Sequence, residues 1–96
     1  DLIGTKDGQL SVIDYKSSYR KKTKDEMNEY FLQLAAYAIA HDWQYKTNIN
    51  SIIVFLAIRN GDFEKTVISG DELKLFKNEW LNRLDIFTEL TGHIYA

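Results

Sequence analysis

The sequence contains no cysteine and no proline, and only five of its 96 residues are glycine. The absence of cysteine excludes disulfide bonds and thiolate metal sites, which fits a reducing compartment. The absence of proline excludes proline-rich linkers and ligand segments, although an average composition would include about 5% proline. The longest apolar run, Ile52 to Ile58, is far shorter than the ~18 residues that a membrane-spanning helix requires. The sequence therefore predicts a compact domain without a membrane segment.

Neither charge sign dominates the sequence. Twelve Lys and Arg residues oppose fourteen Asp and Glu residues, giving a formal net charge of −2. This balance excludes a generally basic nucleic-acid-binding surface but permits a local basic patch. With 45% hydrophobic and 27% charged residues, the composition is that of one globular domain, which we expect to span residues 1–96. The chain begins at Asp1 within a motif and without a Met, so we expect further residues upstream.

The first half of the chain predicts a hairpin followed by a helix. Asp7-Gly8 is a turn signal, and the alternating residues from Gln9 to Lys16 predict its second strand. Thr23 and Glu26 have the spacing of a capping box, which predicts a helix start. The apolar residues that follow recur at helical spacing until about His41, where we expect this helix to end.

The second half predicts a further hairpin and a further helix. Residues 43–50 are polar and aromatic and are expected to form a connector, whereas residues 52–58 are typical of a central strand covered on both faces. An Asn-Gly turn at residues 60–61 leads to a partner strand at 63–68. A second capping pattern at 69–72 opens the last helix, and residues 91–96 give no clear signal. The predicted order is strand, strand, helix, strand, strand, helix, an α/β domain around a mixed sheet.

Apolar residues form one stripe of the last predicted helix, and basic or amide residues lie opposite it. This pattern is typical of an amphipathic helix. The stripe comprises Leu73, Phe76, Trp80, Leu84 and Phe87.

Asp14 and Lys16 are two residues apart on a predicted strand, so their side chains share one face of the sheet. Asp1 lies on the neighbouring strand, close enough to share a metal ion with Asp14. Carboxylates suit a hard cation such as Mg²⁺ or Mn²⁺, and a lysine places positive charge beside an attacking water or the developing phosphorane oxygens. An ordinary ion pair at a strand end is the alternative interpretation of Asp14 and Lys16.

Gln33 and Tyr37 are four residues apart and point to the same side of the next helix. With Asp1 and the run Asp14-Tyr15-Lys16-Ser17-Ser18, the order of these motifs resembles the PD-(D/E)XK nucleases. It is similar to their RecB-type branch, which includes CRISPR-associated Cas nucleases and the mitochondrial genome maintenance exonuclease. The motifs cover residues 1–40, and the remainder matches by element order alone. The resemblance implies a restriction-endonuclease-like mixed sheet flanked by helices, preceded by a helical part upstream.

The resemblance also implies roles for individual residues. Asp1 and Asp14 would be the metal-binding carboxylates, and the main-chain carbonyl of Tyr15 would be a further ligand. Lys16 would orient or activate the attacking water. The first residue carries the chain's ammonium group, which would repel a metal ion at Asp1. The family also has an upstream acidic residue or histidine, so a longer chain, an incomplete site, or an element supplied by a partner subunit of a homo-oligomer are open explanations.

Two further residues of the motif lie on the helix. Gln33 would hold the lysine or a phosphate near the metal, and Tyr37 would contact the nucleic-acid backbone or brace the site. Without the motif, Gln33 would be interpreted as a solvated helix residue and Tyr37 as a core aromatic.

A basic cluster follows the Asp14–Ser18 strand in a segment, residues 17–24, that we expect to be a loop. Its cations would concentrate positive potential where a phosphate backbone would pass, and the neighbouring hydroxyls could donate to phosphate oxygens. An aromatic residue in the segment could stack on a base or sugar. An ordinary solvated loop is the alternative. The residues concerned are Ser17, Ser18, Tyr19, Arg20, Lys21, Lys22 and Lys24.

The sequence therefore predicts a metal-dependent deoxyribonuclease, with exonuclease action on single strands or duplex ends preferred over internal cutting. A non-catalytic nucleic-acid-binding or assembly module with the same fold is the main alternative, and a small α/β interaction domain is a third. The resemblance favours the cytoplasm of a bacterial or phage-infected cell, or an organellar matrix. Roles for the protein in DNA repair or recombination would follow.

Overall fold

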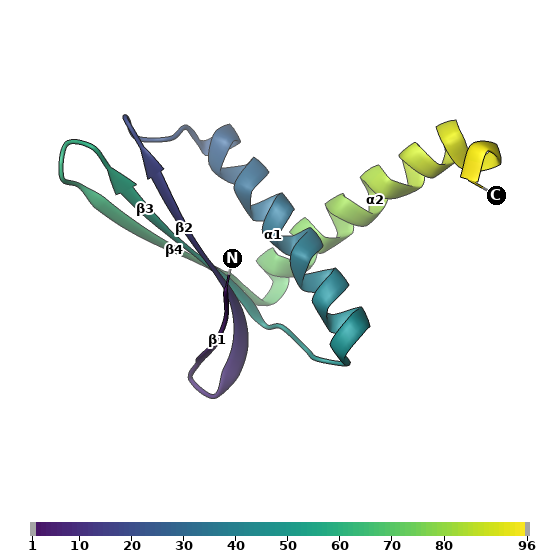
Figure 1. The fold of residues 1–96 in the computed structure, drawn as a ribbon, viewed down its shortest axis with the longest axis horizontal. Coiled ribbons are helices and arrows are strands. Elements are labelled where there is room, and N and C mark those ends of the chain that lie inside the picture. The colour runs from purple at the N-terminus through teal and green to yellow at the C-terminus, as the bar shows by residue number, and fades with distance from the viewer. Residues whose placement is uncertain (1, 96) are drawn as a thin grey trace.

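A computed structural model describes residues 2–95 of the chain, and the side chains of residues 3–5 and 7–89. The elements follow the predicted order, with strands and helices arranged as in Figure 1. Asp1 and Ala96 lie outside the described residues. The elements are β1 (Leu2–Lys6), β2 (Gln9–Ser18), α1 (Lys24–Tyr45), β3 (Ser51–Ile58), β4 (Phe63–Ser69) and α2 (Gly70–Tyr95).

The four strands form one mixed sheet in the order β1-β2-β3-β4. β1 and β2 pair in antiparallel fashion, as do β3 and β4, whereas the central pair β2 and β3 is parallel. A parallel pair needs a crossover connection, and α1 supplies it. The predicted restriction-endonuclease-like α/β architecture is confirmed.

The strand register divides the sheet into two faces. Val12 is paired with Ile52, and Ile52 with Ile68, so these three side chains share a face. That face forms the core with residues from both helices, including Phe31 and Leu73, so α1 and α2 both cover the same side of the sheet (Figure 1). The other buried members of the core are Leu34, Ala35, Ala38, Ile49 and Val54.

The opposite face, which we call the open face, is covered by neither helix. The expectation that residues 52–58 are covered on both faces is therefore wrong at two residues of β3, Phe55 and Ala57. Phe55 is only half-buried and Ala57 is exposed, although Ile53 on the same face is buried. A continuous apolar run cannot reveal this difference, because a run that is half exposed reads the same as one that is fully covered.

β2 continues to Ser18 and α1 begins at Lys24, so the predicted loop at residues 17–24 is too long by three residues and spans only 19–23. Ser17 and Ser18 continue the parallel pairing with Ala57 and Ile58, which fixes them in the sheet despite their weak strand propensity. The capping box that precedes α1 is confirmed: Glu26 donates its main-chain N–H to Thr23 Oγ1 at 3.3 Å.

α1 extends to Tyr45, beyond the predicted end near His41, so the connector is shorter than residues 43–50. The reason lies in Asp42, whose Oδ1 accepts hydrogen bonds from Thr47 Oγ1 at 2.8 Å and from the Ile49 N–H at 2.9 Å. These bonds hold the connector against the last helical turn. Lys46 then ends the helix in the left-handed conformation, with φ 58°.

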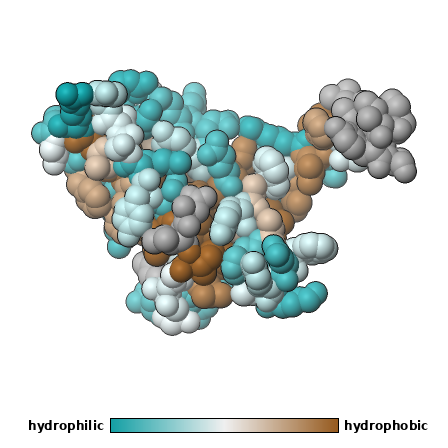
Figure 2. Space-filling model, viewed as in Figure 1, coloured by the Kyte–Doolittle hydropathy of each residue, from teal (hydrophilic) through white to brown (hydrophobic). Residues whose placement is uncertain are grey.

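The apolar stripe of α2 is buried only near its start. Leu73 is buried, and the Phe76 ring contacts Phe31 of α1 edge-on, with centroids 5.5 Å apart. Further along, Leu84 and Phe87 are about half exposed, and the helix projects away from the sheet, with apolar residues continuing along it (Figures 1 and 2). Only the first part of the stripe therefore contributes to the core. Within residues 2–95, no helix is long and apolar enough to cross a membrane.

Candidate functional site

Asp14 and Lys16 lie in the second half of β2, on the face that the helices cover. Lys16 Nζ is 3.0 Å from Asp14 Oδ2, so the two-residue spacing does bring the charges together. Asp14 is 5% exposed, whereas the Lys16 side chain remains one-third exposed. The pair is therefore not the fully exposed ion pair of a strand end: its carboxylate is buried and its ammonium reaches solvent.

Asp14 Oδ2 is buried and has no hydrogen-bond partner among the described residues, although Lys16 is near it. The contact is thus an ion pair without hydrogen-bond geometry. A buried carboxylate oxygen without a hydrogen bond lowers the stability of the fold, so we expect a further group or ion to bind this oxygen. A cation suits this oxygen, because carboxylate oxygens are the preferred ligands of Mg²⁺ and related ions.

Tyr30 of α1 is part of this site, and the sequence analysis did not single it out. Lys16 Nζ lies over the Tyr30 ring, 5.1 Å from the centroid, in a cation–π contact. Lys16 is therefore held from two sides, by Asp14 on its own strand and by Tyr30 on α1. The helical spacing of Tyr30, Gln33 and Tyr37, at i, i+3 and i+7, is the signal that could have identified it.

Gln33 and Tyr37 follow Tyr30 on that side of α1. Gln33 is exposed, and the Tyr37 ring, also partly exposed, stacks near His41 with centroids 6.3 Å apart. Tyr37 is therefore not a core residue. Helical spacing puts both residues on the same side of α1 as Tyr30, about one and two turns further along the helix.

The described pairing of β1 with β2 reaches the residue before Asp14. Leu2 is paired with Ile13, and no described residue of β1 pairs with Asp14 or the residues after it. The Tyr15 side chain points to the open face and is 63% exposed, so only the Tyr15 main chain lies at the level of Asp14. Asp1, the other expected carboxylate, lies outside the described residues.

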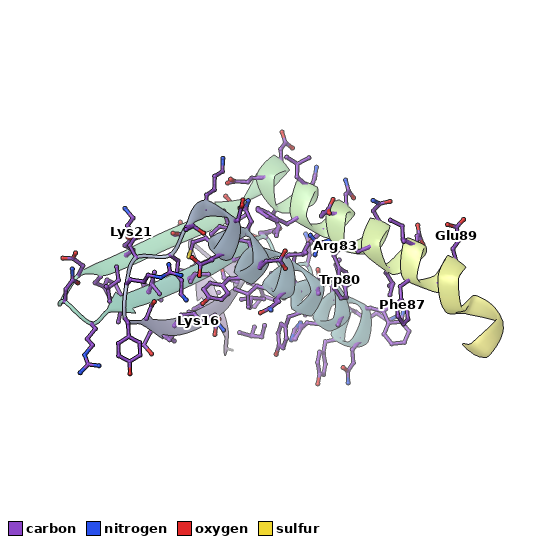
Figure 3. All side chains as sticks on the ribbon, turned by 90° about the horizontal axis from the view of Figure 1, so that it is seen from above. Lys16, Lys21, Trp80, Arg83, Phe87 and Glu89 are labelled. Atoms are coloured by element: carbon purple, nitrogen blue, oxygen red, sulfur yellow. The ribbon has the colours of Figure 1, made fainter. Side chains whose placement is uncertain are left out.

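The basic cluster is engaged in ion pairs. Arg20 forms a two-pronged contact with Glu26, with Nη1 2.8 Å from Oε1 and Nη2 3.0 Å from Oε2. Lys22 is 3.6 Å from the same carboxylate, and Lys21 is 3.7 Å from Glu64 of β4 (Lys21 is labelled in Figure 3). Arg20 thus fastens the segment between β2 and α1 to the first turn of the helix. Arg20 and Lys21 nevertheless stay largely exposed, and Lys24 is exposed as well.

These contacts change the acidity of Glu26. The hydrogen bonds from the Arg20 guanidinium, and then that from the Thr23 main chain, lower the pKa of Glu26 from 4.5 to about 2. The same contact raises the pKa of Arg20 further above its ordinary value. Glu26 therefore stays ionised across the physiological range.

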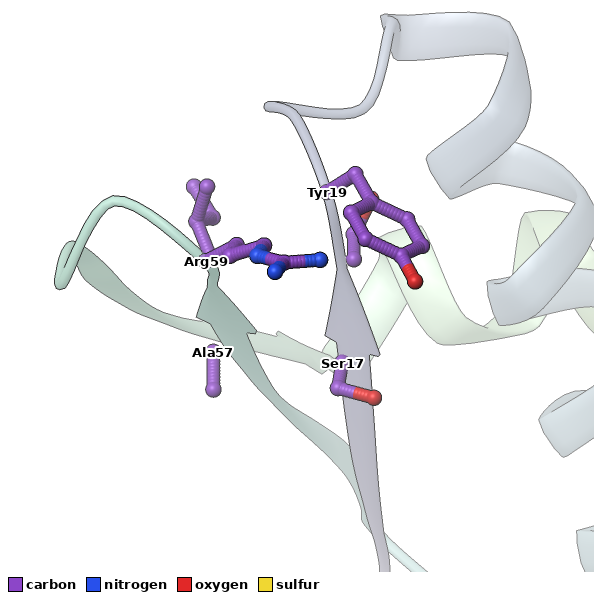
Figure 4. Close-up of a pocket in the computed structure, with 6 residues that line it drawn as sticks. Ser17, Tyr19, Ala57 and Arg59 are labelled. Carbon is purple, nitrogen blue, oxygen red and sulfur yellow. The ribbon is translucent and has the colours of Figure 1, made fainter.

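Ser17 and Tyr19 lie at the end of β2 that is distant from β1, beside a hollow on the sheet. This hollow, of about 390 Å³, is lined by residues of β2 and β3 and by the residues that follow them. Arg59 points toward Tyr19 there, with its guanidinium carbon 4.9 Å from the ring centroid (Figure 4). Ser18 instead accepts the Arg20 N–H at its Oγ. The lining residues are Ser17, Ser18, Tyr19, Ala57, Ile58 and Arg59.

Among the described residues, no group of three or more acidic or histidine side chains converges on one point. Asp14 can therefore supply one carboxylate to a cation, and a complete ligand set needs further groups. His41 bonds within the fold, because its Nδ1 is 2.8 Å from Thr47 Oγ1.

Comparison with protein families gives one match. The family profile described as the PD-(D/E)XK nuclease superfamily matches residues 1–90, which include the Asp14–Lys16 strand, α1 and most of α2. Comparison with curated proteins gives no significant match.

Proposed function

Because the chain belongs to the PD-(D/E)XK nuclease superfamily, whose members are typically nucleases that use divalent metal ions, we propose that it hydrolyses phosphodiester bonds in DNA at the Asp14–Lys16 site. The observation that carries this proposal is the buried Asp14 Oδ2, which has a lysine ammonium beside it and no hydrogen-bond partner among the described residues. A buried ion pair that only stabilised the strand would be expected to have hydrogen bonds to both carboxylate oxygens.

The Asp14 carboxylate is a suitable ligand for a divalent cation. In the proposal, Asp1 and the Tyr15 carbonyl are two further ligands of the same ion. Leu2 is paired with Ile13, the residue that precedes Asp14. This pairing supports the role proposed for Asp1, which precedes Leu2 in the sequence. When bound, Mg²⁺ or Mn²⁺ would polarise a phosphate oxygen and lower the pKa of a bound water.

Lys16 has two tasks in this proposal. Its ammonium donates hydrogen bonds to the non-bridging phosphate oxygens, whose negative charge grows as water attacks phosphorus, and it orients that water. The water oxygen forms the new bond to phosphorus and loses a proton to solvent, the bond to the leaving sugar oxygen breaks, and that oxygen takes up a proton from solvent. Lys16 can serve the substrate because its side chain is one-third exposed, unlike that of Asp14.

Gln33 and Tyr37 extend this arrangement along α1. In the proposal, Gln33 holds a phosphate or the lysine, and Tyr37 contacts the nucleic-acid backbone. Their exposure supports these roles, because a side chain must reach solvent to touch a substrate.

The segment after β2 would guide the substrate backbone. The hydroxyls of Ser17 and Ser18 and the cations that follow them lie directly beyond Lys16 along the chain. We assign Lys21 and Lys24 to phosphate contacts, because they are more exposed than Lys22, while Arg20 is held by Glu26. Loss of a phosphate-contacting lysine lowers the slope of log affinity against log salt by about one.

Within the superfamily, we place the chain in the RecB-type branch, similar to the Cas nucleases and the mitochondrial genome maintenance exonuclease. The run Asp14 to Ser18, with Gln33 and Tyr37 on α1, supports this placement. The branch favours exonuclease action on single strands or duplex ends, in DNA repair or recombination.

The test is metal-dependent degradation of labelled DNA. Single-stranded and duplex DNA are incubated with the protein in Mg²⁺, Mn²⁺ or EDTA, and we expect degradation with either metal and none with EDTA. Asp14→Asn and Lys16→Gln should each lower the rate by at least a hundredfold, because both remove charge from the reacting centre. Full activity of either variant would contradict the proposal.

Matched controls separate chemistry from folding. Asp85→Asn and Lys74→Ala alter exposed residues of α2 and should leave the rate unchanged. The double variant Asp14→Asn/Lys16→Gln removes both charges, which avoids an unpaired buried carboxylate, and should unfold at a urea concentration near that of the wild type. Intact but retarded DNA in every metal would instead support the non-catalytic binding module.

A further inference from the structure

Three aromatic rings lie in a row on one side of α1, beyond the residues of the proposed site. The His41 ring lies between Tyr37 and Tyr45, with centroids 6.3 Å and 4.6 Å away. A second hollow, of about 150 Å³, is lined here by Tyr37, Ala40, His41, Gln44 and Tyr45. None of these lining residues is acidic. The second hollow therefore offers aromatic and amide surface without a carboxylate that would repel a phosphate.

A relay of hydrogen bonds determines which nitrogen of His41 carries a proton. Thr47 Oγ1 lies 2.8 Å from Asp42 Oδ1 and donates to it, because an ionised carboxylate can only accept. A hydroxyl has a single proton, so Thr47 Oγ1 must accept at its other contact, which is 2.8 Å from His41 Nδ1. His41 Nδ1 therefore donates to Thr47, and Nε2 is the nitrogen that gains or loses a proton.

The Nε2 atom takes no part in this relay. The bond at Nδ1 is the one hydrogen bond that the His41 ring makes among the described residues. Because the two nitrogens of an imidazole point away from each other, Nε2 is directed away from Thr47. The His41 side chain is half-buried and lines the second hollow, so its ring is accessible to a ligand there.

The titratable and charged neighbours of His41 come from α1 and α2. Tyr37 and Tyr45 contact its ring, and Asp42 is joined to it through the relay. Lys77 of α2 lies 3.7 Å from Asp42 Oδ2 and partly balances that carboxylate. No residue in the last turn of α1 is basic, so a positive charge on His41 meets no cation in that turn and lies near the negative end of the helix.

We propose that protonated His41 binds a phosphodiester group of the nucleic-acid substrate through Nε2, at the second hollow. The inference rests on the proposed function and extends the path of the substrate along α1. Tyr30 contacts Lys16 at the proposed site, and His41 follows eleven residues later on the same side of the helix. With a rise of about 1.5 Å per residue, His41 lies about 16 Å beyond Tyr30 along the helix, so a strand bound at both places spans several nucleotides.

The test measures binding of a single strand at two pH values. The anisotropy of a fluorescein-labelled oligothymidylate of about 12 nucleotides is followed in EDTA, where no metal-dependent cleavage occurs, at about pH 8 and about pH 6. The affinity of the wild type should rise about tenfold at the lower pH, the effect of one charge-assisted hydrogen bond to a phosphate. His41→Asn keeps an amide donor for Thr47 but cannot gain a proton, so its affinity should be nearly equal at the two pH values.

Salt distinguishes a phosphate contact from a contact to a base. At about pH 6, His41→Asn should lower the slope of log affinity against log salt by about 0.7, the value for one phosphate of a single strand. At about pH 8 the slopes of the variant and the wild type should agree. A lower affinity of His41→Asn with an unchanged slope would assign His41 to a base or sugar, and that outcome overturns the proposal.

A matched control makes the pH effect specific to one histidine. His93→Asn removes the other histidine of the sequence by the same substitution and should retain the tenfold rise. Unfolding in urea confirms that each variant is folded. An affinity of the wild type that is equal at the two pH values, or a tenfold rise that persists in His41→Asn, overturns the proposal.

The failure of this inference is distinguishable from failure of the proposed function. Asp14→Asn should lose cleavage yet keep the pH-dependent binding. Metal-dependent cleavage with binding that does not change with pH would leave the nuclease assignment standing and remove the role of His41. Binding that depends on His41, without any cleavage by the wild type, would contradict the proposed function alone.

Discussion

Lys16 on β2 and Tyr30 on α1 meet in a cation–π contact, with the ammonium 5.1 Å from the ring centroid. The contact links the strand that carries the acidic residue to the helix that carries Gln33 and Tyr37. It also leaves the ammonium without a second carboxylate nearby among the described ion pairs, so Lys16 keeps donors for a phosphate.

Tyr30 therefore acts as a positioning residue. Two substitutions distinguish the contribution of its ring from that of its hydroxyl. Tyr30→Leu should lower the cleavage rate by about fivefold, since an exposed cation–π contact contributes about 1 kcal/mol. Tyr30→Phe keeps the ring and should restore the rate. Single-turnover cleavage measures both, and equal loss in the two variants would show that the ring does not position Lys16.

Acid should weaken the contact between Arg20 and Glu26, which holds the segment after β2 against α1. Folding lowers the pKa of Glu26 to about 2, chiefly through Arg20, so the folded protein binds this proton less readily than the unfolded chain. The stability from this contact is fully present above pH 4.5 and is lost as the pH falls toward 2. In Arg20→Ala, carboxyl titration by NMR should show the pKa of Glu26 moving back toward 4.5; a pKa that stays near 2 would assign the shift to the helix cap.

The close packing of α1 on the sheet depends on alanine. Ala38 is fully buried in the core, so Ala38→Leu should destabilise the fold by about 1–3 kcal/mol through overpacking. Ala40 lies on the exposed side of the same helix, and Ala40→Leu should change stability by less than about 0.5 kcal/mol. Urea unfolding measures both values, and similar midpoints for the two variants would be inconsistent with this packing.

Asp42 stabilises the connection from α1 to β3. Its Oδ1 accepts two hydrogen bonds, and its Oδ2 is 3.7 Å from Lys77 of α2. Asp42→Ala should therefore cost about 1–2 kcal/mol and increase amide exchange at Ile49, which loses its acceptor. Asp85→Ala, at an exposed position of α2, is the matched control and should leave that exchange rate as it is in the wild type.

The element order and the Asp14–Lys16 contact were predictable, because both depend on local periodicity. Alternation on β2 places two side chains on one face wherever the strand lies, and the Thr23–Glu26 cap is likewise local. Asp42 shows where this reasoning fails. Its bonds to Thr47 and Ile49 arise only when the connector folds back, so the sequence placed the helix end too early.

The open face shows a second limit of the sequence. Phe55 and Leu56 are equally apolar, yet Leu56 is buried beneath the helices and Phe55 stacks with partly exposed rings. Likewise, Leu73 and Phe87 belong to one stripe of α2, but only Leu73 lies over the sheet. Hydrophobicity reports which residues prefer burial, and the arrangement of whole elements decides which of them obtain it.

The parallel pairing of β2 with β3 has a consequence for folding kinetics. Each hairpin joins strands that are near neighbours in the chain, whereas Ser11 and Ser51, whose buried hydroxyls meet between the hairpins, are 40 residues apart. Closing that long loop costs entropy before its contacts form, so the two halves should fold locally and dock late. The contact between Asp14 and Lys16 lies within β2 and can form before this docking step, whereas the stacked rings of Tyr15 and Phe55 join β2 to β3 and form only with it.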